Sequence, residues 1–344
     1  MNNPNDNWQP EIFMLEEIVQ SVFDFENLVR EKQKSLPRGS PIETAGLAAL
    51  EMLDTFKRNV PNDTRQDHCT EWRQAIALAD MLRKVLRIAG HPCFGQIWPH
   101  VLLLLGNTNI ALNVWNRKED QDANKIFELY MALVLAPLCL NLELEDPKHS
   151  AGGKNPDVIA TLNGSRWAFA CKVMHSPSPN AFIQRVREGV KQIKNSDAEN
   201  GIVVVSLKNL LPHDLFWTMK ANSEIWNLVM PGPVQPEIAR RMFVHYCESY
   251  HHQIIQELLG GPVAFNDMFK DTKAVAAVLL HLCSTICVVN QGKPSFHFLR
   301  MFGSLNADPL KPDVLTTLES LNNSLHSRFA NPYSASTTPV AMTP

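Results

Sequence analysis

An aspartate and a lysine stand at the two ends of a segment that has the pattern of a β-hairpin. Asp157 precedes the β-prone run 158–162, and Lys172 lies near the end of the run 167–173. The Asn-Gly dipeptide at 163–164 tolerates the positive φ angles of a tight turn. A carboxylate and an ammonium group on neighbouring strands could hold a metal ion and stabilise charge on a phosphate.

The second run of the hairpin presents two different faces, because side chains alternate along a strand. Trp167 and Phe169 lie on a bulky face, which we expect in the core. Ala168, Ala170 and Lys172 lie on the opposite face. We expect this face of small residues to contact something other than the core.

The elements around the hairpin must position these groups. The sequence predicts a helix from about residue 122 to 136, a half-buried strand at 140–145, the hairpin, an amphipathic helix at 180–195 and a buried strand at 201–207. The order is helix, strand, strand, strand, helix, strand. It predicts an α/β (α+β) fold with a mixed four-stranded sheet.

Helical patterns flank this core on both sides. The predicted parts of the chain are a helical N-terminal region (1–121), the core (122–212), a mainly helical C-terminal region (213–330) and a disordered tail (331–344). In the C-terminal region we expect a helix at Val275–Val289 and a short strand at 295–299.

Composition limits the classes of function. The net charge of −3 gives no general attraction to polyanions, so a site for nucleic acid must be a local patch. The seven cysteines are scattered without zinc-knuckle spacing, and we expect reduced, buried thiols. The chain has no signal-peptide pattern and no apolar run of about 18 residues, so we expect a cytoplasmic protein without membrane contact.

With these elements in place, the segment 122–211 resembles the restriction-endonuclease-like PD-(D/E)xK phosphodiesterase superfamily. The resemblance rests on a Pro-Asp pair at 156–157, a Cys-Lys pair at 171–172 and Glu128 in the preceding helix, and it covers about a quarter of the chain. It implies a restriction-endonuclease-like core that hydrolyses nucleic acid, DNA in preference to RNA, with Mg²⁺ or Mn²⁺ as cofactor. It also suggests a role in defence against foreign DNA.

The resemblance implies a role for each residue of the site. Asp157 would be the principal metal ligand, and Glu128 would complete the metal's shell directly or through a bound water. The backbone carbonyl of Cys171 could supply a further oxygen. Lys172 would orient the attacking water or stabilise the phosphate, and Gln192 would look into the site.

Ala170 departs from the superfamily, because it stands where the second acid should be. With one strand acid instead of two, the affinity for Mg²⁺ should fall. Glu188 could supply the missing acid, but at about 100° per residue it lies nearly opposite the apolar stripe of its helix and should point to solvent. Gln192 and Arg185 lie nearer the edge of that stripe and are better placed to look into the site. Glu128, on the preceding helix, is the preferred substitute acid.

A local basic patch follows the hairpin turn. Six basic residues lie between positions 166 and 194, with Glu188 as the only acid among them. Such a patch can neutralise phosphates and would make binding salt-dependent. Five of the six are predicted to bind the substrate: Arg166, Arg185, Arg187, Lys191 and Lys194.

Each of these residues also has a plain structural interpretation. Asp157 could be a turn residue before a strand, and Lys172 could protect an edge strand from aggregation. Glu128 could be a solvated helix residue paired with Lys125, three positions earlier. The basic residues of 185–194 could form a solvated helix face.

Three functions therefore stay open. The first is a Mg²⁺-dependent nuclease whose helical regions bind substrate or partners. The second is a catalytically inactive relative of that fold that binds nucleic acid or serves as a scaffold. The third is an interaction protein in which the sheet is only structural and the helical regions contact another copy or another protein.

Overall fold

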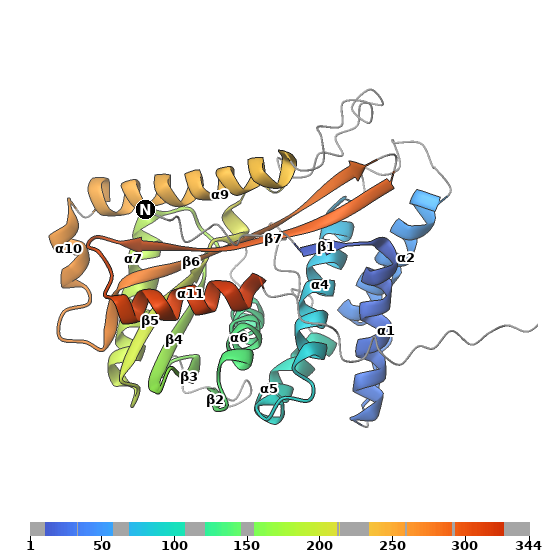
Figure 1. Ribbon diagram of the computed structural model, residues 1–344, viewed down its shortest axis with the longest axis horizontal. Helices are drawn as coiled ribbons and strands as arrows, with labels where there is room; N and C mark the ends of the chain where they lie inside the picture. The colour runs from blue at the N-terminus through green and yellow to red at the C-terminus, as the bar shows by residue number, and fades with distance from the viewer. Residues whose placement is uncertain are drawn as a thin grey trace, which may run out of the picture.

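Seven strands form one mixed sheet at the centre of the computed structural model (Figure 1). Their order across the sheet is β1-β7-β6-β5-β4-β3-β2, in which β4, β5 and β6 run parallel and the other neighbours are antiparallel. The strands are β1 (Glu11–Phe13), β2 (Leu142–Leu144), β3 (Val158–Leu162), β4 (Ser165–Val173), β5 (Asn200–Ser206), β6 (Ala274–Asn290) and β7 (Lys293–Asn306). The structure describes residues 11–326 except for 33, 58–68, 107–120, 146–154, 212, 214–233, 259 and 291–292.

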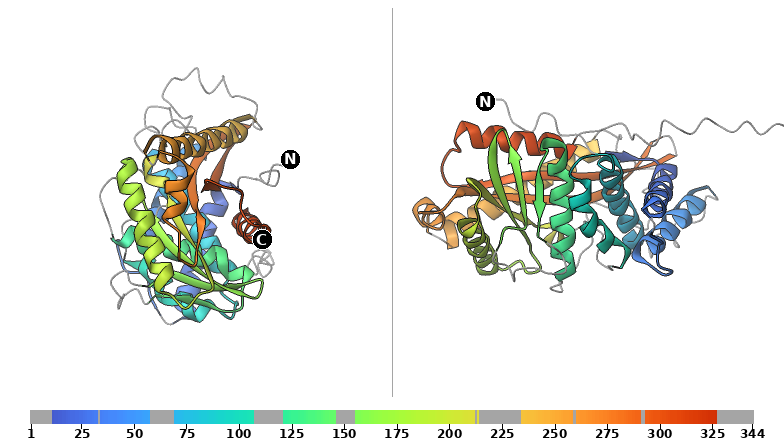
Figure 2. Two further views of the ribbon diagram at one scale, coloured as in Figure 1. Left: turned by 90° about the vertical axis from the view of Figure 1, so that its left-hand side faces the viewer. Right: turned by 90° about the horizontal axis from the view of Figure 1, so that it is seen from below.

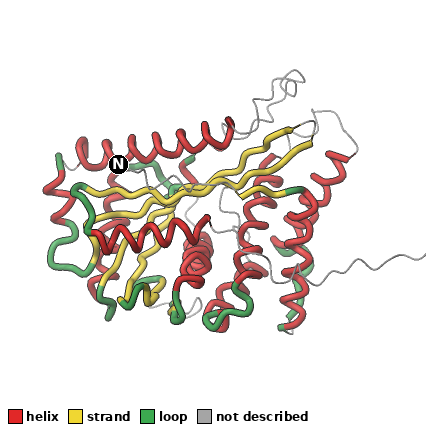
Figure 3. The backbone as a smooth tube through the Cα atoms, in the orientation of Figure 1, coloured by secondary structure: helices red, strands yellow, loops and turns green. Residues whose placement is uncertain are grey.

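Helices cover both faces of the sheet (Figures 2 and 3). One face is covered by α1 (Leu15–Glu31), α2 (Pro41–Lys57), α4 (Cys69–Arg87), α5 (Phe94–Val101), α6 (Gln121–Leu135) and α11 (Pro312–His326). The other face is covered by α7 (Pro179–Asn195), α9 (Val234–His252) and α10 (Pro262–Asp267). Four further short helical segments are Leu102–Leu105, Ala136–Leu138, Lys208–Leu210 and Gln253–Leu258. Within the described part of the chain, every helix is too short or too polar to cross a lipid bilayer.

The predicted hairpin is present as β3 and β4. Its turn has positive φ angles at both central residues, 50° at Asn163 and 81° at Gly164. Glycine and asparagine tolerate this conformation best, and it matches the twist of the two strands. The helix before the hairpin is α6, the helix after it is α7, and the predicted strands on either side are β2 and β5.

The two faces of β4 are both buried. Phe169 packs in the layer of α6, as the bulky face predicted. The expectation for the small face was wrong, because Ala168 and Ala170 are fully buried beneath α7. A methyl group on Gly189 of α7 would lie 2.9 Å from the side chain of Val203 and 3.2 Å from that of Ala170. The residues are small here because the helix approaches the sheet closely.

The sheet is larger than the four strands that the sequence predicted. The expected helix at Val275–Val289 is wrong, since these residues form most of β6. The short strand expected at 295–299 is confirmed and is part of the longer β7. A continuous apolar run does not distinguish a buried strand from a buried helix, and β6 is buried because it lies between β5 and β7 with helices on both faces. The region 213–330 is therefore only partly helical.

The described part of the N-terminal region is helical, as predicted, apart from the short strand β1. β1 pairs with β7, with Glu11 opposite Phe298, and so forms one edge of the sheet. In Figure 1 the long strands β6 and β7 cross the molecule from the side of α10 to the side of α1 and α2. The tail predicted at 331–344 lies outside the described residues.

Candidate active site

Asp157 lies just before β3 and is held by the neighbouring strand. Only 5% of the residue is exposed. Its backbone N–H donates to the Phe169 carbonyl at 3.2 Å. Its carboxylate Oδ2 accepts a hydrogen bond from the Cys171 backbone N–H at 2.6 Å and contacts the Lys172 ammonium at 3.4 Å. The hairpin therefore places Asp157 and Lys172 in direct contact.

Gln192 brings the following helix into the same group. Its Oε1 accepts a hydrogen bond from the Lys172 ammonium at 2.6 Å, and the residue is buried. The helix α7 that carries it begins at Ser178, whose side chain caps the first turn by accepting from the Ala181 N–H. The predicted orientation of Gln192 toward the lysine agrees with this contact.

Glu128 lies on α6 and is almost fully buried, with 3% of the residue exposed. Its Oε2 lies 2.8 Å from the Lys125 ammonium, so the alternative pairing with Lys125 is present. Lys125 also lies 3.6 Å from Oε2 of Glu145, the residue that follows β2. Glu128 is therefore part of a buried ionic group and not a solvated helix residue.

Electrostatic effects connect this group to Asp157. Burial raises the pKa of Asp157 to about 6, and the charge of Glu128 adds to this rise, while Lys172 opposes it. Burial lowers the pKa of Lys125, but the charges of Glu128, Asp157 and Glu145 raise it overall above its ordinary value. The three carboxylates therefore act on the same lysine.

His100, on α5, faces the same group. It is 1% exposed, and its Nε2 lies 3.9 Å from Oε2 of Glu128. Neither ring nitrogen has a hydrogen-bond partner among the described residues. The sequence did not indicate His100, because no pattern links it to the hairpin. Glu145 had a weak signal, since it ends the strand predicted before the hairpin.

The structure shows a role for the backbone of Cys171 that differs from the predicted one. Its N–H donates to Asp157, while the role of its carbonyl as a metal ligand stays a prediction. Burial raises the pKa of the Cys171 thiol well above its ordinary value, and the charges of Asp157 and Glu128 add to this effect. The thiol is therefore protonated at neutral pH and is a poor metal ligand.

Position 170 has no room for the acid that the superfamily places there. Ala170 is fully buried, and Gly189 of α7 lies directly against it. Glu188 contacts two residues of its own helix, Gln184 at 3.1 Å and Arg185 at 3.2 Å. Glu145 is thus a better placed third carboxylate than Glu188, because it already contacts Lys125.

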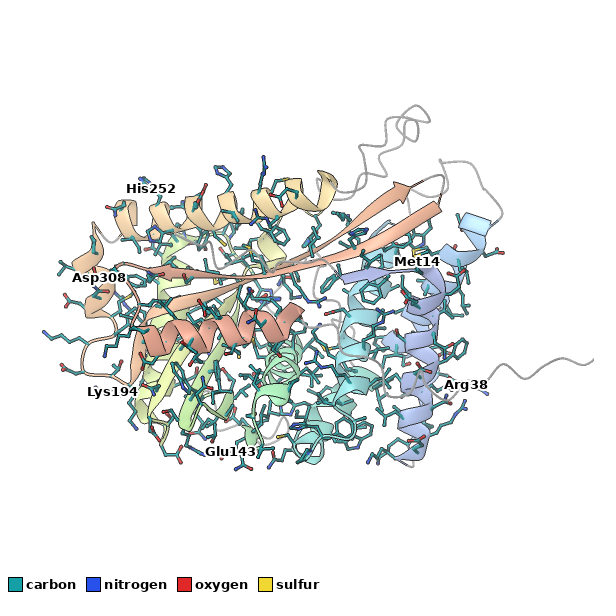
Figure 4. All side chains as sticks on the ribbon, in the orientation of Figure 1. Met14, Arg38, Glu143, Lys194, His252 and Asp308 are labelled. Carbon is teal, nitrogen blue, oxygen red and sulfur yellow. The ribbon has the colours of Figure 1, made fainter. Side chains whose placement is uncertain are left out.

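The predicted substrate-binding residues differ in their availability. Arg166 makes hydrogen bonds at 2.7 and 2.9 Å to Glu143 and lies 3.2 Å from Asp197. Arg185 lies 3.2 Å from Glu188. By contrast, the remaining three are exposed on α7; these are Arg187, Lys191 and Lys194. In Figure 4, Glu143 and Lys194 lie at the margin of the molecule.

No metal-binding group is preassembled in the described part of the chain. The acidic, histidine and cysteine side chains there include no set of three placed to hold a metal ion. Around Glu128, the ammonium group of Lys125 occupies the space that a cation would take. The arrangement offers the positive charge of Lys172, held by Asp157 and Gln192, to a bound anion.

Comparisons of the chain with protein-family models, with curated proteins and with solved structures find no match. The assignment of a function therefore depends on the geometry of the site itself.

Proposed function

We propose that this protein hydrolyses phosphodiester bonds of nucleic acid, DNA in preference to RNA, with Mg²⁺ or Mn²⁺ as cofactor. In this proposal α6, β2, β3, β4, α7 and β5 serve as a restriction-endonuclease-like core. The observation that carries it is the contact of Lys172 with both Asp157 and Gln192, at 3.4 and 2.6 Å, next to the buried Glu128. Glu128, Lys172 and Gln192 come from three elements, α6, β4 and α7, and Asp157 lies just before β3.

The acids of the site fit a hard divalent cation. Asp157 has a pKa of about 6, so it is mostly ionised at neutral pH and could accept a metal ion there. Asp157, Glu128 and the Cys171 carbonyl would hold the ion. When bound, such an ion supplies a water of lowered pKa and an electrophile for the phosphate.

The chain's own residues would position the reacting groups. Lys172 keeps its ammonium between Asp157 and Gln192, where it can hold an attacking water or donate to a phosphate oxygen. Gln192 restricts the rotamer of Lys172 because it accepts its shortest hydrogen bond. Burial excludes bulk water and strengthens these electrostatic contacts.

The exposed face of α7 is the surface proposed for the nucleic acid backbone. Arg187, Lys191 and Lys194 are exposed there, and together they could neutralise several phosphates. Arg166 is a weaker candidate because Glu143 and Asp197 already hold it. Defence against foreign DNA is the part of the proposal that depends on resemblance alone. A cytoplasmic setting is a separate part of the proposal and extends the prediction made from the sequence pattern.

A second candidate function is a catalytically inactive, nucleic-acid-binding relative of such an enzyme. It is favoured by the packing at Ala170, where α7 closes the position of the second acid. It is also favoured by the Lys125 ammonium, which neutralises Glu128 without a metal. In this case α7 would bind nucleic acid, and no bond would be broken.

Cleavage assays test the first function against the second. Plasmid, linear and single-stranded DNA are incubated with the purified protein in Mg²⁺ or Mn²⁺, beside Asp157→Asn and Lys172→Met. We expect cleavage that falls by roughly 100-fold or more in both variants, the usual scale for removal of a group that stabilises the transition state. Lys270→Met, an exposed lysine after α10, serves as the control.

Two outcomes would overturn the proposal. Cleavage that survives both substitutions removes Asp157 and Lys172 from the chemistry. Salt-sensitive binding of DNA without any cleavage selects the second function. RNA substrates in the same assay decide which nucleic acid is preferred.

A further inference from the structure

The ammonium group of Lys125 lies where a metal ion could lie. It is 2.8 Å from Glu128 and 3.6 Å from Glu145, and both carboxylate side chains are less than 10% exposed. The Lys125 side chain is itself 18% exposed, so it has a path to solvent that the two acids lack. A lysine held in this way can leave the site without disturbing the core.

His100 is the second observation that points to a ligand at this position. A buried imidazole without a hydrogen bond is costly, because both of its nitrogens have lost their water. His100 is 1% exposed, neither nitrogen has a hydrogen-bond partner among the described residues, and Nε2 lies 3.9 Å from Glu128 Oε2. Two ligands about 2.1 Å from one ion can be at most about 4.2 Å apart, so both atoms could bind the same ion.

Glu145 is tied to the hairpin by its backbone as well as to Lys125 by its side chain. Its N–H donates to the Asp157 carbonyl at 3.4 Å. β2 therefore delivers this carboxylate to the end of β3, next to Asp157. Gly189 packs directly against Ala170, so position 170 has no room for an acid and a further carboxylate must come from outside β4. Glu145 is such a carboxylate, and it already contacts Lys125.

We propose that His100, Glu128 and Glu145 form a binding site for a divalent cation of the Mn²⁺ class, and that this ion binds in exchange for the Lys125 ammonium. The inference rests on the proposed function and deepens it, because His100 and Glu145 join Glu128 as ligands of the ion that Asp157 and the Cys171 carbonyl would also hold. Imidazole nitrogen suits Mn²⁺ and other first-row ions better than it suits Mg²⁺, which prefers oxygen. The site should therefore prefer Mn²⁺ to Mg²⁺.

The exchange also improves the balance of charge. Three carboxylates, those of Glu128, Glu145 and Asp157, act on Lys125, and Lys172 contacts only Asp157 among them. A divalent ion brings one more positive charge than the ammonium that it replaces. The displaced Lys125, at the exposed margin of the site, would then be free to contact an anionic substrate.

Mn²⁺ binding to the full chain, measured by titration calorimetry at pH 7.5, tests the exchange. Lys125→Met removes the competing cation, and we expect Mn²⁺ to bind roughly tenfold more tightly. His100→Leu removes the nitrogen ligand at similar volume, and we expect Mn²⁺ to bind roughly tenfold more weakly, the lower end of the loss seen when metal sites lose supporting groups. The same substitution should change Mg²⁺ affinity less than Mn²⁺ affinity.

Controls separate these effects from general changes in charge and fold. Lys270→Met and His252→Leu replace exposed residues of the same types and should leave Mn²⁺ affinity unchanged. The gain expected for Lys125→Met cannot arise from unfolding. An affinity within twofold of the wild type in either Lys125→Met or His100→Leu would overturn the inference, and so would the absence of Mn²⁺ binding in Lys125→Met.

The outcome for the metal is distinct from the outcome for the function. Mn²⁺ affinities that change as expected, without cleavage of any nucleic acid, would support the site and refute the hydrolase. Cleavage that depends on Asp157, together with Mn²⁺ affinities that both variants leave unchanged, would support the hydrolase and refute this site.

Discussion

Two clusters of buried charge can be compared within the described part of the chain, and they are built differently. The core cluster consists of Asp80 on α4, Lys84 one turn later and Arg300 on β7. Asp80 Oδ1 accepts from Lys84 at 2.6 Å and from Arg300 at 2.7 Å, and Arg300 also donates to the carbonyl of Leu325 on α11. These short contacts join three elements across the core.

The site cluster consists of the groups around Asp157 and Lys125. In this cluster Lys172 lies 3.4 Å from Asp157, and the charge of Glu128 adds to the rise in the pKa of Asp157 that burial causes. The core cluster therefore holds α4, β7 and α11 together. The site cluster instead keeps like charges close together, which lowers the stability of the folded protein. Buried groups with a raised pKa and a neighbouring like charge are typical of functional sites.

The largest effect is expected from breaking the core cluster. Arg300→Met leaves Asp80 with one cation in place of two and removes the bond to Leu325. Breaking a buried ion pair costs about 3–5 kcal/mol, so we expect the free energy of unfolding to fall by that amount. Urea denaturation of the variant and of Arg241→Met, whose arginine is 77% exposed, provides the measurement and its control. A fall of less than 1 kcal/mol in the free energy of unfolding would show that the core cluster does not hold these three elements together.

The next effect concerns the position of the missing acid. Ala170→Glu must fit a longer side chain beneath Gly189, so we expect a loss of roughly 3 kcal/mol or more from overpacking and from a buried carboxylate. Ala264→Glu, at an exposed position of α10, is the control. If Ala170→Glu folds with the stability of the wild type and gains cleavage, position 170 belongs to the site cluster after all.

The elements of the site were predictable because each has a local signal. The Asn-Gly turn marks the hairpin, and the apolar stripe of α7 orients Gln192. His100 could not be assigned from the sequence, because only the packing of α5 against α6 brings it to Glu128. The pairing of Lys125 with Glu128 has a local signal in their spacing, whereas the contact of Lys125 with Glu145 depends on the packing of β2 against α6. The strand β6 was missed for a related reason, since burial on both faces removes the periodicity that separates strand from helix.

A smaller effect, of opposite sign, is expected at Asp157. The pKa of Asp157 is about 6 in the folded protein and 3.8 in its ordinary state, so its contribution to stability is complete below pH 3.8 and is lost as the pH rises through 6. We therefore expect Asp157→Asn to be more stable than the wild type at pH 7.5, by roughly 1–3 kcal/mol.

Thermal or chemical unfolding between pH 4 and 8 measures this difference. The advantage of Asp157→Asn should shrink below pH 6 and vanish near pH 4. Glu188→Gln, at a partly exposed position of α7, is the control. A variant that is less stable than the wild type at pH 7.5 would place Asp157 with the core cluster, as a structural residue.

The smallest effect is expected at the surface. Arg166 contacts Glu143 and Asp197, whose side chains are 53% and 73% exposed. Exposed ion pairs contribute about 0–1 kcal/mol, so Arg166→Ala should change the stability by no more than that. We also expect DNA affinity in a filter-binding assay to fall less in Arg166→Ala than in Lys191→Ala. The reverse order would assign Arg166 to the nucleic acid surface.

The pairing of β1 with β7 has a consequence for how the chain folds. Phe13 lies opposite Phe296, so the first described strand pairs with the last one. Contacts between such distant parts of a chain form slowly, because a long loop must close first. During synthesis the N-terminal helices can form early, but β1 stays unpaired until β7 has been translated. Until then, the strand edge is the part of the nascent chain most exposed to aggregation and to chaperones.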